Sequence, residues 1–134
     1  MFERITTTPD PYEPYLLSQA IKMGDLLFVS GQAGYADKGQ IVSGGFMAQG
    51  EQAFSNLSRA LRAGGSSLAH VLKVTIFVTE MQPNFEHVVA LRRKFWSAPY
   101  PADTIVEVKA LYVPEALIEI EAIAAVVSLM EASS

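Results

Sequence analysis

The feature that most constrains this chain is a pair of β-strand patterns in its last third. Residues 103–110 and a second run that starts near Leu117 both fit a period of two, and the second places Ile118 and Ile120 on one face. Pro114 lies between the runs, and because proline cannot donate to a sheet ladder it marks a break. The stretch predicts two strands joined by a loop.

Three glutamates, Glu107, Glu119 and Glu121, lie inside these otherwise apolar runs. Carboxylates are rarely left in such surroundings without a partner or a functional role. A strand face that is simply solvated explains them as well, because antiparallel sheets often have one wet face. Both interpretations stay open at this point.

Length and composition restrict the class of protein. A chain of 134 residues predicts one domain, residues 1–134. The chain has no cysteine, which excludes disulfides, thiolate metal sites and thiol catalysis. Ten basic residues against fourteen acidic ones weigh against nucleic acid as a partner, and the short run Arg92-Arg93-Lys94 is interpreted as a solvated helix face.

The N-terminal segment is charged and has no apolar core of signal-peptide length, and no stretch is apolar enough to span a membrane. We therefore expect a soluble, cytoplasmic protein. Half of the residues are hydrophobic, which indicates either a generous core or apolar surface buried between subunits.

Periodicity predicts strands and two helices along the rest of the chain. Strands are expected at 2–7, 16–23, 26–30, 40–42 and 72–79, and helices at 46–63 and from an Asn84 cap to Trp96. Two helices cover only one face of such a sheet, which gives an α+β layered fold. The other face then needs a cover, and another subunit is the natural candidate.

The candidate chemistry is limited to carboxylates, hydroxyls and backbone groups. His70 and His87 lack metal-ligand spacing, so no metal site is predicted. Ser30 and Ser43 lie outside nucleophile motifs, and the glycine pairs match no phosphate or dinucleotide loop. These groups suit the positioning of a water against a carbon that is already electrophilic.

Several strings in the same order resemble the RidA family, also called YjgF or L-PSP. They include SQAIKMGDLLFVSGQ at 18–32, VLKVTIFVT at 71–79, PADT at 101–104 and IEIEAIA at 118–124. The resemblance implies a chorismate-mutase-like α+β fold with two helices on one sheet face. It also implies a homotrimer whose ligand clefts lie between adjacent subunits.

Archetypal members of that family hydrolyse 2-imino or enamine acids to 2-oxo acids and ammonia without a cofactor. The resemblance implies that Glu119 orients the attacking water and that Tyr15 contacts the ligand, although Leu16 and Leu17 are extra residues beside it. It makes Gln32 and the backbone after Ser30 further candidates for the cleft.

Asp103 stands where the family has an arginine that pairs with the substrate carboxylate, and Val89 replaces an asparagine-like position. A negative charge there repels a carboxylate, so we expect an altered substrate. Asp103 either binds an amino or iminium group or caps the start of its strand.

The leading hypothesis is a RidA-like homotrimer that binds a small nitrogen-containing metabolite and hydrolyses its C=N bond, as an imine deaminase or an aminomuconate-type deaminase does. One alternative is a non-catalytic ligand-binding or chaperone-like trimer. The other is a ribonuclease of the L-PSP type, against which the net acidity argues.

Overall fold

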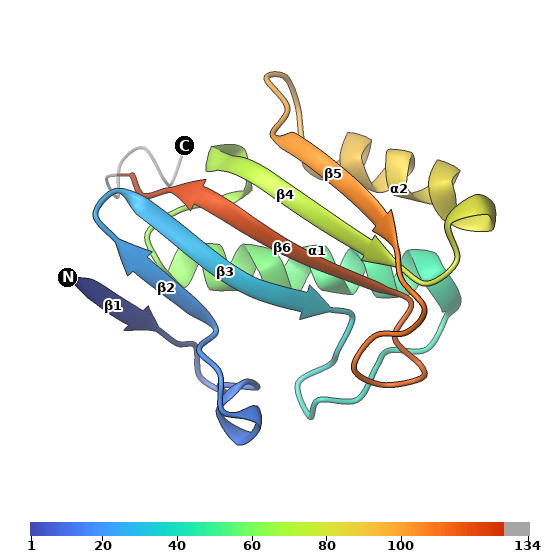
Figure 1. Ribbon diagram of the computed structural model, residues 1–134, viewed down its shortest axis with the longest axis horizontal. Coiled ribbons are helices and arrows are strands. Elements are labelled where there is room, and N and C mark those ends of the chain that lie inside the picture. The colour runs from blue at the N-terminus through green and yellow to red at the C-terminus, as the bar shows by residue number, and fades with distance from the viewer. Residues whose placement is uncertain (128–134) are drawn as a thin grey trace.

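The structure, a computed structural model, describes residues 1–127; the last seven residues of the predicted domain 1–134 lie outside this part. Figure 1 shows a twisted sheet with both helices behind it. The strands are β1 (Phe2–Ile5), β2 (Ala20–Met23), β3 (Leu26–Ala33), β4 (Val71–Val78), β5 (Ala102–Glu107) and β6 (Ile118–Ala125). The helices are α1 (Gly45–Ala63) and α2 (Met81–Phe95), with short 3-10 turns at Glu13–Tyr15 and Leu68–His70.

Within the described residues, the six strands form one sheet in the order β1-β2-β3-β6-β4-β5. Neighbouring strands run antiparallel except β4 and β5, which are parallel and connected through α2. The last strand in sequence, β6, thus lies in the middle of the sheet, between β3 and β4. This central place explains the strong alternation of its sequence, because one of its faces is buried completely.

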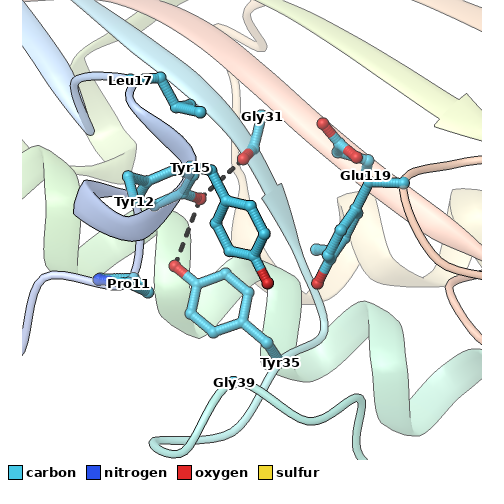
Figure 2. Close-up of a pocket in the computed structure, with 10 residues that line it drawn as sticks. Pro11, Tyr12, Tyr15, Leu17, Gly31, Tyr35, Gly39 and Glu119 are labelled. Carbon is cyan, nitrogen blue, oxygen red and sulfur yellow. Dashed lines mark hydrogen bonds between the residues drawn. The ribbon is translucent and has the colours of Figure 1, made fainter.

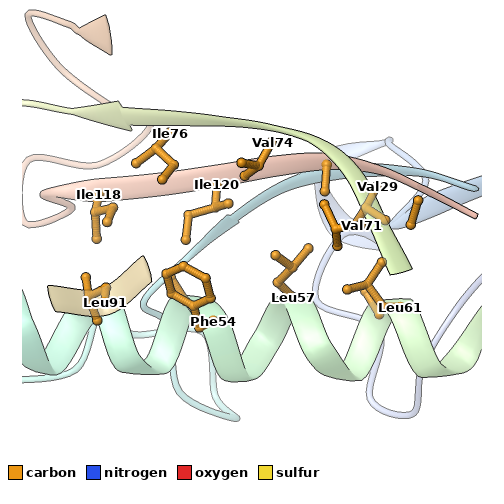
Figure 3. Packing of buried hydrophobic residues seen from close by; sticks show 14 of the residues in the cluster. Val29, Phe54, Leu57, Leu61, Val71, Val74, Ile76, Leu91, Ile118 and Ile120 are labelled. Carbon is orange, nitrogen blue, oxygen red and sulfur yellow. The ribbon is translucent and has the colours of Figure 1, made fainter. Parts of the chain in front are cut away.

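The hydrophobic core lies between the sheet and α1. Figure 3 shows Phe54 and Leu57 of α1 pointing toward Ile118 and Ile120 of β6, all of them fully buried. Gly50, a weak helix former, lies in α1 under Leu91 of α2, where an added Cβ would overlap the Leu91 side chain. The predicted α+β fold with two helices on one sheet face is confirmed.

The predicted start of the second helix is wrong. The helix begins at Met81, and Asn84 lies inside it, with its side-chain amide donating to the Glu80 carbonyl oxygen over 3.0 Å. The first helical N–H, that of Met81, is instead bound by the Glu107 carboxylate of β5 at 2.8 Å. A residue distant in the sequence therefore does the capping.

Among the predicted strands, two differ most from the structure, and the strand predicted at 103–110 ends early, at Glu107. The strand predicted at 16–23 begins only at Ala20, because Leu16 adopts a left-handed conformation (φ 63°) that ends a 3-10 turn. The strand predicted at 40–42 is reduced to a single bridge between Tyr35 and Ile41.

The sheet face opposite the helices is open in a single chain. Leu26 and Phe28 of β3 are exposed there, and Ile123 of β6 and Ile21 of β2 are half-exposed beside them. Across residues 1–127, neither helix combines the length and the apolar character that crossing a bilayer requires.

Candidate ligand pocket

A cavity of about 280 Å³ opens beside the ends of β3 and β6 (Figure 2). Its polar side chains are four tyrosines and one carboxylate: Tyr12, Tyr15, Tyr35, Tyr112 and Glu119. Small or apolar residues complete the lining: Pro11, Leu17, Gly31, Ala33 and Gly39. The volume lies near the lower limit for ligand sites, which suits a small metabolite.

Glu119 enters the cavity from β6. The strand buries Ile118 and Ile120 against the helices, so Glu119 points to the open face and is half-buried there. Burial raises the pKa of the Glu119 carboxyl above its usual range, and the nearby Glu121 carboxylate raises it further. A carboxyl group with a raised pKa in a cavity is a stronger base than an ordinary glutamate and is suited to proton transfer.

Gly31 of β3 makes room for this carboxylate. An ideal Cβ at position 31 would overlap the Glu119 side chain. The register of β3 and β6 shifts between Val29 and Gln32, at the point where Gly31 faces Glu119. Bulges of this kind re-aim side chains next to functional sites.

Two buried tyrosines form the floor of the cavity. The Tyr12 hydroxyl donates to the Gly31 carbonyl oxygen over 2.7 Å, and the Tyr35 hydroxyl donates to Gln32 Oε1 over 2.8 Å. Their rings meet edge to face with centroids 6.1 Å apart. Burial raises the pKa of both hydroxyls, so they stay protonated and serve as fixed donors.

Tyr15 and Tyr112 form the rim. These residues are 67% and 51% exposed; Tyr15 ends the short 3-10 turn Glu13–Tyr15, and Tyr112 lies in the loop between β5 and β6. The pKa of the Tyr112 hydroxyl is raised by burial and then by the Glu119 carboxylate. The two rings can therefore contact a ligand without being part of the core.

The structure brings two of the four predicted site residues together in this cavity, Tyr15 and Glu119. Gln32 is fully buried behind the cavity, where its Nε2 donates to the Ser30 carbonyl oxygen over 2.9 Å and its Oε1 holds Tyr35. In a single chain, Gln32 therefore supports the floor instead of lining the cavity.

Asp103 lies on β5 and is not among the residues that line the cavity of a single chain. Its two carboxylate oxygens each accept a 2.9 Å hydrogen bond from Arg92 of α2, one from Nε and one from Nη2. Both side chains are largely shielded, at 26% and 19% exposure for Arg92 and Asp103. This bidentate pair matches the Asp103 charge with a cation.

Sequence reasoning missed Tyr12, Tyr35 and Tyr112; it named the backbone after Ser30 as a cleft group, and Gly31 does line the cavity. The three tyrosines lie outside helices and strands, so no period marked them. The space that Gly31 leaves for the Glu119 side chain could not be predicted from the sequence, because it depends on the pairing of β3 with β6.

Metal ligation finds no support in the described residues, where no three histidine or acidic side chains gather as ligands would. The cavity combines one partly desolvated carboxylate with aromatic walls. That set can bind a small flat molecule and move one proton to or from water beside it.

The sequence pattern of the family described as Endoribonuclease L-PSP matches residues 5–126. Together with the fold, this match shows that the chain belongs to the RidA/YjgF (L-PSP) family, as its sequence strings indicate.

Two relatives and one solved structure illustrate the similarity to known members of this family. RutC family protein y4sK from Sinorhizobium fredii is 41% identical over 125 residues, covering 92% of this chain and 97% of the relative. A 2-iminobutanoate/2-iminopropanoate deaminase from Dermatophagoides farinae is 33% identical over 125 residues, covering 90% of this chain and 94% of the deaminase. The crystal structure of RidA from an Antarctic Psychrobacter species is 33% identical, with a TM-score of 0.84 over 92% of this chain and 99% of that one.

Proposed function

We propose that the protein hydrolyses the C=N bond of a small imine or enamine and releases ammonia, with Glu119 as the catalytic residue. The observation that carries this proposal is the half-buried Glu119 carboxylate, which faces a small cavity with aromatic walls and has a raised pKa. The name of the similar deaminase from Dermatophagoides farinae agrees with this reaction class.

In the proposed reaction, the ionised Glu119 carboxylate accepts a proton from water while the water oxygen bonds to the imine carbon. The C=N π electrons move to nitrogen, Glu119 returns its proton to that nitrogen, and the intermediate carries a hydroxyl and an amino group on one carbon. Glu119 then takes the hydroxyl proton and passes it to the amino group, the C–N bond breaks, ammonia leaves, and the oxygen becomes a carbonyl. Water is the only co-reactant.

We further propose that the open sheet face is covered by two other copies of this chain. Leu26 and Phe28 are 40% and 42% exposed in a single chain, and Ile21 and Ile123 extend the same apolar surface. The homotrimer that the family resemblance implies would bury this face and close the cavity with a neighbouring subunit.

Asp103 remains a proposed selectivity residue that acts from the neighbouring subunit. The salt bridge with Arg92 neutralises the Asp103 charge, so Asp103 repels a substrate carboxylate less than an unpaired aspartate would. Gln32 is proposed to act through Tyr35, whose hydroxyl it binds.

The ribonuclease alternative has less support. The ten described residues that line the cavity include no lysine, arginine or histidine, and the whole chain carries a formal charge of −4. Binding of an RNA backbone depends on positive charge. A non-catalytic ligand-binding trimer remains the rival that experiment must distinguish.

The test is a screen for ammonia release from imines and enamines generated in solution by an amino-acid oxidase or a pyridoxal-phosphate lyase. Each substrate is run with the wild-type protein, with Glu119→Ala and with a protein-free blank. We expect release above the blank for at least one substrate, lost in Glu119→Ala. Thermal stabilisation by substrates without any ammonia release would favour the ligand-binding rival.

A further inference from the structure

We propose that the cavity takes its ligand as a cation, with an iminium or ammonium nitrogen held against the Tyr15 and Tyr112 rings and the Glu119 carboxylate. The inference deepens the proposed function, because it names the charge of the substrate at the same site. The preference for a cation concerns binding in the cavity and does not require turnover, so the preference and the proposed hydrolysis can fail separately.

The charges that one chain places around the cavity disfavour an anion as the ligand. Of the ten described residues around the cavity, Glu119 alone is charged, and none is lysine, arginine or histidine. A ligand carboxylate would lose its hydration there and find a like charge in return. Arg92, the partner of Asp103, donates two of its N–H groups to that carboxylate.

The floor of the cavity also lacks free donors for an anion. Each tyrosine hydroxyl has a single proton, and those of Tyr12 and Tyr35 are directed to the Gly31 carbonyl and to Gln32. These residues therefore present rings and oxygen lone pairs to the cavity. The face of an aromatic ring carries partial negative charge, which attracts cations.

The rim supplies the rings that a ligand can reach. Tyr15 and Tyr112 are more than half exposed, and the Glu119 carboxylate adds to burial in raising the pKa of the Tyr112 hydroxyl. Figure 2 shows the Tyr15 ring between the buried tyrosines and Glu119. A cation seated there would touch aromatic surface on one side and a carboxylate on the other.

Cation binding also agrees with the chemistry. A protonated imine is more electrophilic at carbon than a neutral one, because the positive nitrogen draws electrons from the C=N bond. The same charge stabilises the ionised form of Glu119, the form that accepts a proton from water. The charge selected by the pocket is therefore the charge that hydrolysis needs.

Isothermal titration calorimetry with three probes of similar size and different charge tests the inference on the full chain. The probes are benzylamine, which is a cation at pH 7, neutral benzyl alcohol and anionic benzoate. We expect benzylamine to bind at least about tenfold more tightly than benzyl alcohol, and benzoate more weakly than both.

Variants identify the groups responsible. Tyr15→Leu and Tyr112→Leu should each weaken benzylamine binding by about 3- to 10-fold, while Tyr15→Phe and Tyr112→Phe keep the ring and most of the affinity. Both positions are on the rim, so the fold should tolerate the changes. Glu119→Gln should remove most of the preference for benzylamine over benzyl alcohol and leave benzyl alcohol binding almost unchanged.

Benzoate binding as tightly as benzylamine would overturn the inference, and so would a failure of all three probes to bind or an unchanged preference in Glu119→Gln. The proposed function has a separate outcome. If benzylamine binds but no imine releases ammonia, the proposed hydrolysis is wrong and the proposed cation site is supported. If ammonia is released but benzoate binds more tightly than benzylamine, the proposed hydrolysis is supported and the proposed cation site is wrong.

Discussion

At the scale of single residues, the site depends on one carboxylate and on the glycine that faces it. Glu119 has an ordinary place in an alternating strand, but the missing side chain at position 31 gives its carboxylate space. Burial and Glu121 then raise its pKa. The proposed function thus depends on a contact between two strands that are distant in the sequence.

Gly31→Ala should reduce ammonia release by on the order of 100-fold with little loss of stability. The new methyl group displaces only the end of the flexible Glu119 side chain, but small displacements of a catalytic group have large effects on rate. Kinetics and thermal unfolding measure the two effects.

Gly34→Ala is the matched control, because an added Cβ there would lie 2.6 Å from the Gln49 carbonyl oxygen, which is backbone. It should destabilise the protein by about 1–3 kcal/mol. A Gly31→Ala protein with normal turnover would contradict the role of this clearance.

The pH dependence of turnover should carry the signature of Glu119. The base must be ionised, and its pKa is raised, so the rate should increase with pH along a limb that lies above the usual range of a glutamate. Glu121→Gln removes the second cause of that shift and should move the limb to lower pH. Tyr12 and Tyr112, which also face Glu119, stay neutral over this range because their pKa values are raised.

Rates of wild type and Glu121→Gln are measured against pH with the same substrate, and the positions of the rising limb are compared. Any titration of the substrate affects both proteins equally. A limb that moves to higher pH, or does not move, would rule out Glu119 as the group observed.

The same raised pKa has a consequence for stability. A group whose folded pKa exceeds its unfolded value stabilises the fold at low pH and loses that contribution as pH rises through the folded pKa. Glu119→Gln should therefore unfold at a higher temperature than wild type at pH 7, and the difference should shrink in acid. Thermal scans at two pH values test the sign.

At the scale of elements, β5 organises α2. Its Glu107 carboxylate binds the first N–H of the helix, and its Asp103 holds Arg92 one turn from the helix end. Two of the acidic side chains in the C-terminal strands therefore have structural partners on the helix side. Glu119 and Glu121, on the open side of β6, do not share that role.

Glu107→Ala should destabilise the protein by about 1 kcal/mol, because the Met81 N–H loses its acceptor at the start of α2. Glu107→Gln keeps a side-chain oxygen and should recover much of the loss. Denaturant unfolding of both variants makes the comparison, and equal stability of Glu107→Ala and wild type would show that the cap contributes nothing.

The sequence predicted the elements whose periodicity is set by burial. The alternation of β6 and the apolar stripe of α1 both follow from one buried face, and both were predicted within a residue or two. The start of α2 was not predicted, because its cap comes from β5 and the local signal at Asn84 was misleading. Glu119 and Tyr15 came from family resemblance, whereas the supporting role of Gln32 depends on how Tyr35 folds back onto it.

At the scale of the whole molecule, the helices cover one face of the sheet, and the other face is exposed to solvent in a single chain. The open face carries Phe28 and Leu26, and the cavity opens on the same side as Glu119. An assembly that covers this face would complete the core and the site together. This is the physical reason to expect activity and oligomeric state to change together.

Sedimentation equilibrium should give a mass about three times the 14.6 kDa of one chain. Phe28→Glu should reduce that mass toward one chain, because it places a charge in the buried interface while leaving the core of each chain intact. Phe85→Glu makes the same change at an exposed site on α2, on the opposite side of the sheet; it serves as the control and should remain trimeric. A monomeric wild-type protein would contradict the proposed assembly.

The central claim, that Glu119 activates water in the tyrosine cavity, is tested most directly by ammonia release from an imine generated in solution, compared between Glu119→Gln and Glu121→Gln. The two variants make the same chemical change two residues apart on one strand. We predict that Glu119→Gln loses about 100-fold or more of the wild-type rate while Glu121→Gln retains most of it. Equal rates in the two variants would contradict the claim.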